Sequence, residues 1–348
     1  LANKLHKARA LKLSFSLKSE GSAKFTENGR EEKTPMNRIN DFITVDKKEI
    51  SMLFAAFDRT LSVLDFSLMK DSMSNTGYMV TTTSGKYLLK LYSNTTDEIE
   101  TAVYKYLEDK INVPKLYYYD GGKQRFPFAY TITEFLDGVT FIQYLRTNLK
   151  YPPEMSCEIG RTCAAIHKRK YAHDALLNKN LNISNILPIT HEKIMRLIKA
   201  KPAEYLKPET VEMLYEFIRE NPEPFDRIEA ESVLCHGDFG YNNILVSGGK
   251  IYFIDFEFAY SGSIYNDLGR FFRRKGDDVQ ALVDSHILDA FAQGYNSVSS
   301  SPLPSDWLRL AHLCDINSML CLLTYDNVPE KWVEDIEYDI LSAIKNDT

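Results

Sequence analysis

Hydrophobic and polar positions along the first third of the chain alternate in the manner of β-strands. YMVTTT (78–83) and KYLLKLY (86–92) are rich in β-branched and aromatic residues, and the two-residue break between them predicts a hairpin. VPKLYYYD (113–120) and FAYTITEFL (128–136) predict two further strands. Residues 37–60 predict a short strand or turn followed by a helix.

One helix interrupts this strand-rich part. In TTDEIETAVYKYLEDK (95–110), apolar residues recur at the i, i+4, i+7 and i+8 positions counted from Ile99, which is the spacing of one helix face. Asp97 and Glu100 lie three residues apart at its start and predict a capping-box-like beginning.

The pattern changes after Gly138, where most segments have helical spacing. The sequence therefore predicts an α+β protein with a small β-rich first part and a larger, mostly helical second part that carries one β-like insertion. The predicted helices of the second part are 154–170, 191–200, 209–220, 264–274, 279–296, 305–324 and 331–345.

Length and composition place the chain among soluble globular proteins of about two domains or lobes. It has 348 residues, of which 44% are hydrophobic, and no apolar run of the roughly 18 residues that span a bilayer, so we expect no membrane contact. Its five cysteines form no CxxC pair, which favours a reducing cytoplasm over a disulfide framework or a zinc site. The formal net charge of −6 argues against a nucleic-acid partner and allows a cationic substrate.

Charge is distributed unevenly. Residues 1–35 hold eight Lys/Arg and four Asp/Glu, a net of +4, so residues 36–348 carry −6 − 4 = −10. The basic segment has some features of a transit peptide. We prefer the hypothesis that residues 1–35 are a disordered or non-native upstream extension and that translation begins at Met36, because Arg-Glu-Glu-Lys at 30–33 can be encoded by a ribosome-binding sequence.

The most informative stretch is LCHGDFGYNNILV, in which His236, Gly237 and Asp238 are followed by Asn243. Further along, the apolar run IYFI ends at Asp255. A carboxylate beside buried aromatic residues is costly unless a cation compensates it. A strand–turn–strand unit can fold Asn243 and Asp255 towards each other, and two protein oxygens with phosphate oxygens and water are the usual Mg²⁺ ligands in phosphotransferases.

Asp238 then has a different role from Asp255. It precedes Asn243 on the same loop and can accept the proton of a substrate hydroxyl that attacks a γ-phosphate. We therefore interpret Asp238 as the catalytic aspartate and Asp255 as the metal aspartate. The Phe-Gly that follows Asp238, which suggests a protein-kinase metal site, is coincidental.

These motifs together resemble the aminoglycoside phosphotransferase and choline kinase-like family: HGD with an asparagine after four further residues, then ID at 254–255 and NDLG at 266–269. The resemblance implies a bilobal, protein-kinase-like fold. Residues 36–137 would form the nucleotide-binding N-lobe, and residues 138–348 would form the catalytic and substrate-binding C-lobe.

The resemblance also implies the residues that bind the nucleotide. Lys90 would hold the phosphates and pair with Glu100, with Glu98 as the rival acid. The loop before Tyr78 would cover the phosphates through donors at Ser72 and Ser74, because it lacks the glycine pattern of protein kinases.

The segment between the lobes resembles an adenine-binding hinge, formed here by Thr133, Glu134 and Phe135. Its backbone would bind the base, so the choice between ATP and GTP stays open.

Several other residues receive supporting roles. We expect His236 and Asp267 to brace the loop, and Glu257 to face the substrate pocket. We expect the arginines of the 264–274 helix, at positions 270, 273 and 274, to form a solvated face rather than part of a site.

The resulting expectation is a Mg²⁺-dependent small-molecule kinase that uses ATP or GTP and acts on a hydroxyl, first of all on an aminoglycoside-type antibiotic. The alternatives are a metabolite kinase for choline, a sugar or an amino alcohol, and an inactive binding protein with the same fold.

Overall fold

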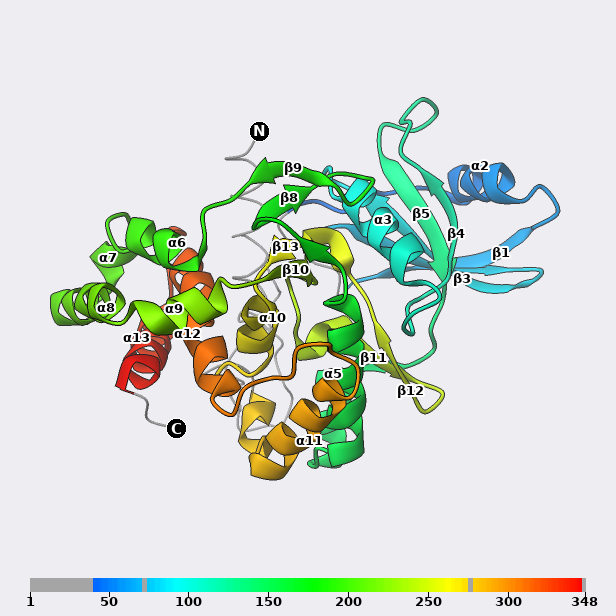
Figure 1. Ribbon diagram of the computed structural model, residues 1–348. Coiled ribbons are helices and arrows are strands. Elements are labelled where there is room, and N and C mark those ends of the chain that lie inside the picture. The colour runs from blue at the N-terminus through cyan, green and yellow to red at the C-terminus, as the bar shows by residue number, and fades with distance from the viewer. Residues whose placement is uncertain (1–39, 71–73, 275–277, 346–348) are drawn as a thin grey trace, which may run out of the picture.

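The computed structural model describes residues 40–70, 74–274 and 278–345. These form two lobes, an N-lobe built on one sheet and a larger, mostly helical C-lobe (Figure 1). The predicted α+β, bilobal fold is therefore confirmed. The predicted extension at residues 1–35 lies outside the described residues. Among the described residues, no helix has the length and apolar character needed to cross a bilayer.

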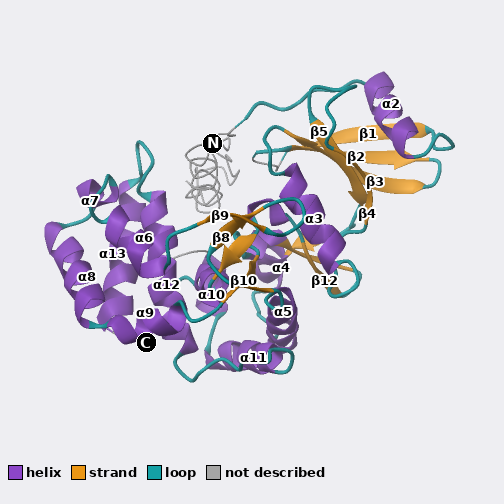
Figure 2. Ribbon diagram, turned by 45° about the horizontal axis from the view of Figure 1, so that its top comes forward, coloured by secondary structure: helices purple, strands orange, loops and turns teal. Residues whose placement is uncertain are grey.

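The N-lobe is a five-stranded antiparallel sheet with the strand order β1-β2-β3-β5-β4. Figure 2 shows this sheet as a separate layer of strands, with α2 beside it and α3 between it and the C-lobe. The elements are β1 (Val63–Met69), β2 (Thr76–Thr82), β3 (Gly85–Tyr92), β4 (Leu116–Asp120), β5 (Ala129–Glu134), α2 (Lys47–Phe57) and α3 (Asp97–Leu107).

The predicted hairpin is the centre of this sheet. β2 and β3 pair in an unbroken antiparallel register that ends at Thr82 and Gly85, and Gly85 adopts a φ of 128°, a conformation that glycine reaches at little cost. Apolar side chains of β3 and β5 pack under α2, including Leu89, Leu91 and Ile132. The alternation of the sequence therefore sets which face of β3 is buried, and it places Lys90 on the opposite face.

The predicted helix at 95–110 forms as α3, but its predicted cap is wrong. The helix begins after Thr96, whose side chain makes no capping hydrogen bond. The carboxylate of Asp97 instead accepts a hydrogen bond of 2.7 Å from the hydroxyl of Tyr119 on β4. The carboxylate of Asp97 is thus used in a tertiary contact with Tyr119 and does not cap the helix.

The C-lobe contains two small sheets and ten α-helices among its described residues. One sheet has the order β7-β10-β13-β8-β9 and the other the order β12-β11-β6. The strands are β6 (Val139–Thr140), β7 (Lys170–Tyr171), β8 (Ala175–Leu177), β9 (Ile183–Ile186), β10 (Ser232–Cys235), β11 (Ile244–Ser247), β12 (Lys250–Phe253) and β13 (Tyr260–Gly262). The helices are α4 (Phe141–Asn148), α5 (Pro153–Ile166), α6 (Thr190–Leu197), α7 (Pro202–Tyr205), α8 (Pro208–Glu220), α9 (Pro222–Ile228), α10 (Ile264–Phe271), α11 (Ser285–Asn296), α12 (Trp307–Leu322) and α13 (Glu330–Lys345).

Three short 3₁₀ turns complete the lobe: η1 (Tyr241–Asn243), η2 (Phe256–Phe258) and η3 (Asp278–Leu282). The first two lie at the predicted motif residues. η1 ends at Asn243 and leads into β11, while η2 begins just after Asp255 at the end of β12. The β11–β12 hairpin therefore carries the two predicted metal ligands on neighbouring strand ends.

Candidate active site

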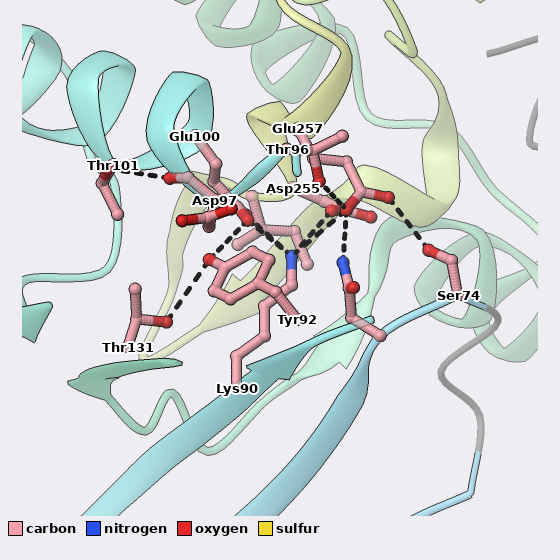
Figure 3. A network of polar contacts seen from close by, with 12 residues as sticks. Ser74, Lys90, Tyr92, Thr96, Asp97, Glu100, Thr101, Thr131, Asp255 and Glu257 are labelled. Atoms are coloured by element: carbon pink, nitrogen blue, oxygen red, sulfur yellow. Dashed lines mark hydrogen bonds and ion pairs between the residues drawn. The ribbon is translucent and has the colours of Figure 1, made fainter. Parts of the chain in front are cut away.

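Lys90 connects the two lobes. Its Nζ, on the central strand β3, lies 2.7 and 2.9 Å from the two carboxylate oxygens of Glu100 on α3, and 3.1 Å from Oδ1 of Asp255 (Figure 3). Glu100 is buried, whereas the rival acid Glu98 is exposed. The structure thus places Glu100, and not Glu98, beside Lys90.

Electrostatics keep this lysine charged. Burial alone would lower the pKa of Lys90, but the negative charges of Asp255 and Glu100 outweigh that effect and leave the pKa well above its usual value. Burial raises the pKa of Glu100, and the charge of Lys90 opposes this shift. The hydroxyl of Tyr92 also donates to Glu100 at 2.7 Å, so the carboxylate is held from two sides.

Asp255 follows β12 in a left-handed conformation, with a φ of 66°. A non-glycine residue there is uncommon, and Asp is among the residue types that adopt this conformation most readily. The hydroxyl of Tyr104 lies 3.1 Å from the backbone nitrogen of Asp255. The carboxylate of Asp255 points to Lys90, as Figure 3 shows.

Glu257 does not lie where the sequence suggested. Its side chain is fully buried and accepts hydrogen bonds of 3.1 Å from both Ser74 and Thr96, as well as one from the amide of Asn75. Those three residues belong to the N-lobe, and Lys90 lies 3.9 Å away. Its described contacts with Ser74, Asn75, Thr96 and Lys90 are therefore all with the N-lobe. Ser72 lies outside the described residues.

Asp238 and Asn243 form the second half of the site. The side-chain amide of Asn243 donates to the backbone oxygen of Asp238 at 2.7 Å and to its Oδ2 at 2.9 Å. The backbone of Asn243 also accepts from the amide of Ile254 at 3.0 Å, so Asn243 lies opposite the residue that precedes Asp255 across the β11–β12 hairpin. The structure therefore places Asp238 and Asn243 in contact, with Asp255 at the neighbouring strand end of the hairpin.

The loop that carries Asp238 is braced from α10. Asp267 accepts hydrogen bonds from the backbone amides of His236 at 2.7 Å and Gly237 at 3.0 Å, and from the ring of His167 at 3.2 Å. Burial would raise the pKa of Asp267, but the hydrogen bond and charge of His167 and the proximity of His236 leave it below the usual value. Gly237 has a φ of 80°, and a Cβ there would overlap the carbonyl oxygen of Phe258.

His236 has a second supporting contact, since its Nε2 lies 3.0 Å from the carbonyl oxygen of Ile254. The placement of His236 and Asp267 thus supports a bracing role for both. His167, at the end of α5, was not singled out from the sequence, because its partner lies 100 residues away.

The expectation of a solvated arginine face on α10 is wrong. Arg270 is buried and donates to Oδ1 of Asp238 at 3.2 Å. Arg273 is buried against Asp315 of α12, and Arg274 contacts the buried His312. Helical spacing alone did not reveal this, because α10 is covered on several sides by α12 and the catalytic loop.

The predicted hinge lies at the end of β5, where the chain passes to β6 in the C-lobe. Thr133 is buried in the sheet opposite Leu88 of β3, and Glu134 pairs with Tyr87. Phe135 follows the strand, with the ammonium of Lys86 5.8 Å from its ring centroid.

Asp255, one of the two predicted metal ligands, belongs to a group of three carboxylates around Lys90. Oxygens of Glu100, Asp255 and Glu257 lie within 4.8 Å of one another, and three carboxylates exceed the single positive charge of Lys90. The side chain of Asp255 keeps 23% of its surface exposed, so it remains reachable. Oxygen-only donors of this kind match the preference of Mg²⁺.

Fold and site together define a phosphotransferase with a protein-kinase-like, bilobal architecture. Residues 65–312 match the model of the phosphotransferase enzyme family, and the chain belongs to that family. A comparison with curated protein sequences gave no match.

Solved structures share the fold at low sequence identity. Aminoglycoside phosphotransferase APH(4)-Ia superposes with a TM-score of 0.61 at 16% identity, covering 87% of this chain and 99% of that one. Choline kinase from Cryptosporidium parvum gives 0.55 at 14% identity, covering 86% and 96%. Spectinomycin phosphotransferase APH(9)-Ia, solved with ADP and spectinomycin, gives 0.54 at 15% identity, covering 85% and 98%.

Proposed function

We propose that this enzyme transfers the γ-phosphate of ATP or GTP to a hydroxyl of a small molecule. The observation that carries the proposal is the contact of Lys90 with Asp255 between the two lobes, beside a hairpin end where Asn243 contacts Asp238. A cation for phosphate, two oxygen ligands for a metal and a base for a hydroxyl are the groups that this reaction needs.

Each residue has a defined task in the reaction. Lys90, held by Glu100, binds the phosphates and neutralises charge that develops on them. Asn243 and Asp255 would hold Mg²⁺, which supplies further charge neutralisation when bound. The backbone from Thr133 to Phe135 would bind the nucleotide base, and Ser74 would lie over the phosphates.

Asp238 carries out the proton transfer. The acceptor oxygen forms a bond to the γ-phosphorus while the bond from that phosphorus to the β-phosphate bridging oxygen breaks. The hydroxyl proton passes to the carboxylate of Asp238, and the nucleoside diphosphate leaves. Orientation of the hydroxyl by Asp238 contributes to the rate as well, because the reactants are already in place.

An aminoglycoside-type antibiotic is the first candidate for the acceptor. A variant of APH(4)-Ia has been solved with AMP-PNP and hygromycin B, and its fold matches this chain with a TM-score of 0.60. The net charge of −10 over residues 36–348 would also suit a polycationic acceptor. The fold of choline kinase also matches this chain, with a TM-score of 0.55, so an amino alcohol is the second candidate.

The inactive binding protein is the least favoured alternative, since Lys90, Asp238, Asn243 and Asp255 are all present and grouped. A cytoplasmic location agrees with the cysteines, which are free thiols in the described structure.

The test is a coupled assay of nucleotide consumption over a panel of aminoglycosides, other antibiotics, choline, amino alcohols and sugars, with ATP and GTP as donors. Wild type and the exposed control Asp289→Asn should both turn over an acceptor from the panel. Asp238→Asn should retain nucleotide binding and lose activity by about 10²- to 10⁴-fold. Absence of turnover with every acceptor, together with no binding of Mg²⁺-nucleotide, would favour the inactive protein.

A further inference from the structure

A buried arginine reaches the proposed base from a helix outside the motif. Arg270 lies on α10, and its terminal nitrogen donates to Oδ1 of Asp238 at 3.2 Å. The two side chains are only 8% and 9% exposed. We propose that Arg270 is a positioning residue that holds the Asp238 carboxylate for proton transfer. This inference rests on the proposed function, in which Asp238 is the base.

The bonding of Arg270 differs from that of its neighbour Arg273. Arg273 makes two hydrogen bonds, of 2.6 and 2.8 Å, to the carboxylate of Asp315, which is the arrangement of a structural ion pair. Within the described residues, the guanidinium of Arg270 makes one hydrogen bond, to Asp238, and its buried Nε has no hydrogen-bond partner. A buried guanidinium with few partners costs folding free energy, and its contact with the carboxylate of Asp238 is one reason for the protein to retain it.

The contact completes the fixation of the Asp238 carboxylate. Asn243 donates to Oδ2 at 2.9 Å, and Arg270 donates to Oδ1. With a donor on each oxygen, the plane of the carboxylate is set, while each oxygen keeps lone-pair capacity for an acceptor hydroxyl. Without Arg270, the carboxylate would be held from one side only and could rotate away from the position that proton transfer needs.

The first experiment compares Arg270→Met and Arg270→Lys with wild type in the coupled assay. Arg270→Met should lower kcat by about 10- to 100-fold, as expected for a misplaced catalytic group. The KM for nucleotide should stay within about twofold, because Arg270 acts on the base and not on the phosphate site. Arg270→Lys should recover part of the loss. The exposed arginine variant Arg161→Met is the matched control, and melting temperatures show whether each variant is folded.

A double-mutant cycle with Asp238→Asn shows whether Arg270 acts through Asp238. If it does, Arg270→Met should not reduce further the residual rate of the Asp238→Asn protein. An equal fractional loss in both backgrounds, or full activity of Arg270→Met, would overturn the inference while the proposed function stands. A wild-type enzyme without any turnover would overturn the proposed function and this inference with it.

Discussion

At the scale of single residues, Lys90 illustrates how a buried charge is maintained. Its ammonium faces Glu100 and Asp255 within 3.1 Å and Glu257 at 3.9 Å, so the negative charge around it exceeds its own. Three carboxylates so close together repel each other unless a cation lies between them. Lys90 therefore has a structural role as well as the proposed role in binding phosphate.

These two roles can be separated by mutation. Lys90→Met should lower the free energy of unfolding by about 3 kcal/mol, since it leaves Glu100 buried without its partner. It should also reduce kcat/KM for the nucleotide by at least about 100-fold, because charge neutralisation is lost. The double variant Lys90→Met/Glu100→Gln should regain stability but not activity. Urea unfolding and the coupled assay measure the two effects.

The interpretation would be wrong if the double variant were as active as Glu100→Gln alone. Phosphate binding would then not depend on Lys90.

The residue scale also shows how much of the site the sequence could reveal. Asp238, Asn243 and Asp255 follow from spacing, because a hairpin joins them and the local chain decides their separation. Arg270 and Glu257 do not, because their partners lie 32 residues away in one case and 161 or more in the other. Such contacts depend on how lobes and helices pack, which no local pattern encodes.

At the scale of elements, most of the long segments formed as predicted, whereas several very short strands were not predicted. The hairpin of β2 and β3 and the helices α8, α12 and α13 lie within a few residues of their predicted ranges. Strands β7, β8 and β9 have two to four residues each and were not predicted, because segments this short cannot display the alternation of a strand. Their sheet exists because β10 and β13 provide edges to pair with.

The packing of α10 on α12 gives a prediction of pH dependence. His312 on α12 lies between these helices, where its Nε2 donates to the carbonyl oxygen of Phe272 at 2.9 Å and its Nδ1 accepts from Arg274 at 3.3 Å. Burial lowers the pKa of His312 to about 4 from its ordinary value of 6.5. The folded protein therefore holds this ring neutral at a pH where the unfolded chain binds a proton.

The sign follows from this difference in proton binding. Between about pH 6.5 and pH 4 the unfolded state binds more protons at this site, so the free energy of unfolding falls as the pH falls. The contribution of His312 between pH 7.5 and pH 5 is about 2 kcal/mol. His312→Gln can still donate to the carbonyl of Phe272. Its free energy of unfolding should fall less than that of wild type over the same range, by the contribution of His312.

Urea unfolding of wild type and His312→Gln at the two pH values measures this contribution. The exposed His286→Gln variant is the matched control and should behave as wild type. Asp267, whose pKa is lowered, reduces the free energy of unfolding only as the pH falls below about its ordinary value of 3.8, which lies outside this range. Parallel losses in wild type and His312→Gln would show that His312 is not the group responsible.

At the scale of the whole molecule, the two lobes are joined by polar contacts as well as by the chain. Lys90 of the N-lobe bonds to Asp255, and Ser74, Asn75 and Thr96 all donate to Glu257 (Figure 3). Asp255 and Glu257 lie two residues apart, on the same short segment after β12. This segment therefore links the residues just before β2, strand β3 and the start of α3 to the C-lobe.

This arrangement predicts that Glu257 affects nucleotide affinity through lobe position. Glu257→Ala removes the acceptor for three N-lobe donors, so the N-lobe should be held less closely over the proposed phosphate site. We expect the Kd for Mg²⁺-nucleotide to rise by about 10- to 100-fold, which at saturating nucleotide removes about 1.4 to 2.7 kcal/mol of ligand-induced stabilisation. Glu257→Gln keeps one carbonyl oxygen as acceptor and should lie between Glu257→Ala and wild type.

Thermal unfolding with and without Mg²⁺-nucleotide measures this effect as a shift in Tm. Glu229→Gln is the matched control, because that carboxylate is also largely buried but bonds to His191 within the C-lobe. Its shift should equal that of wild type. If Glu257→Ala gave the same ligand-induced shift as well, the bridge at Glu257 would be a contact of the unliganded protein alone. The position of the N-lobe relative to the C-lobe would then be set by Lys90 and the backbone at the end of β5, which are unchanged in the Glu257 and Glu229 variants.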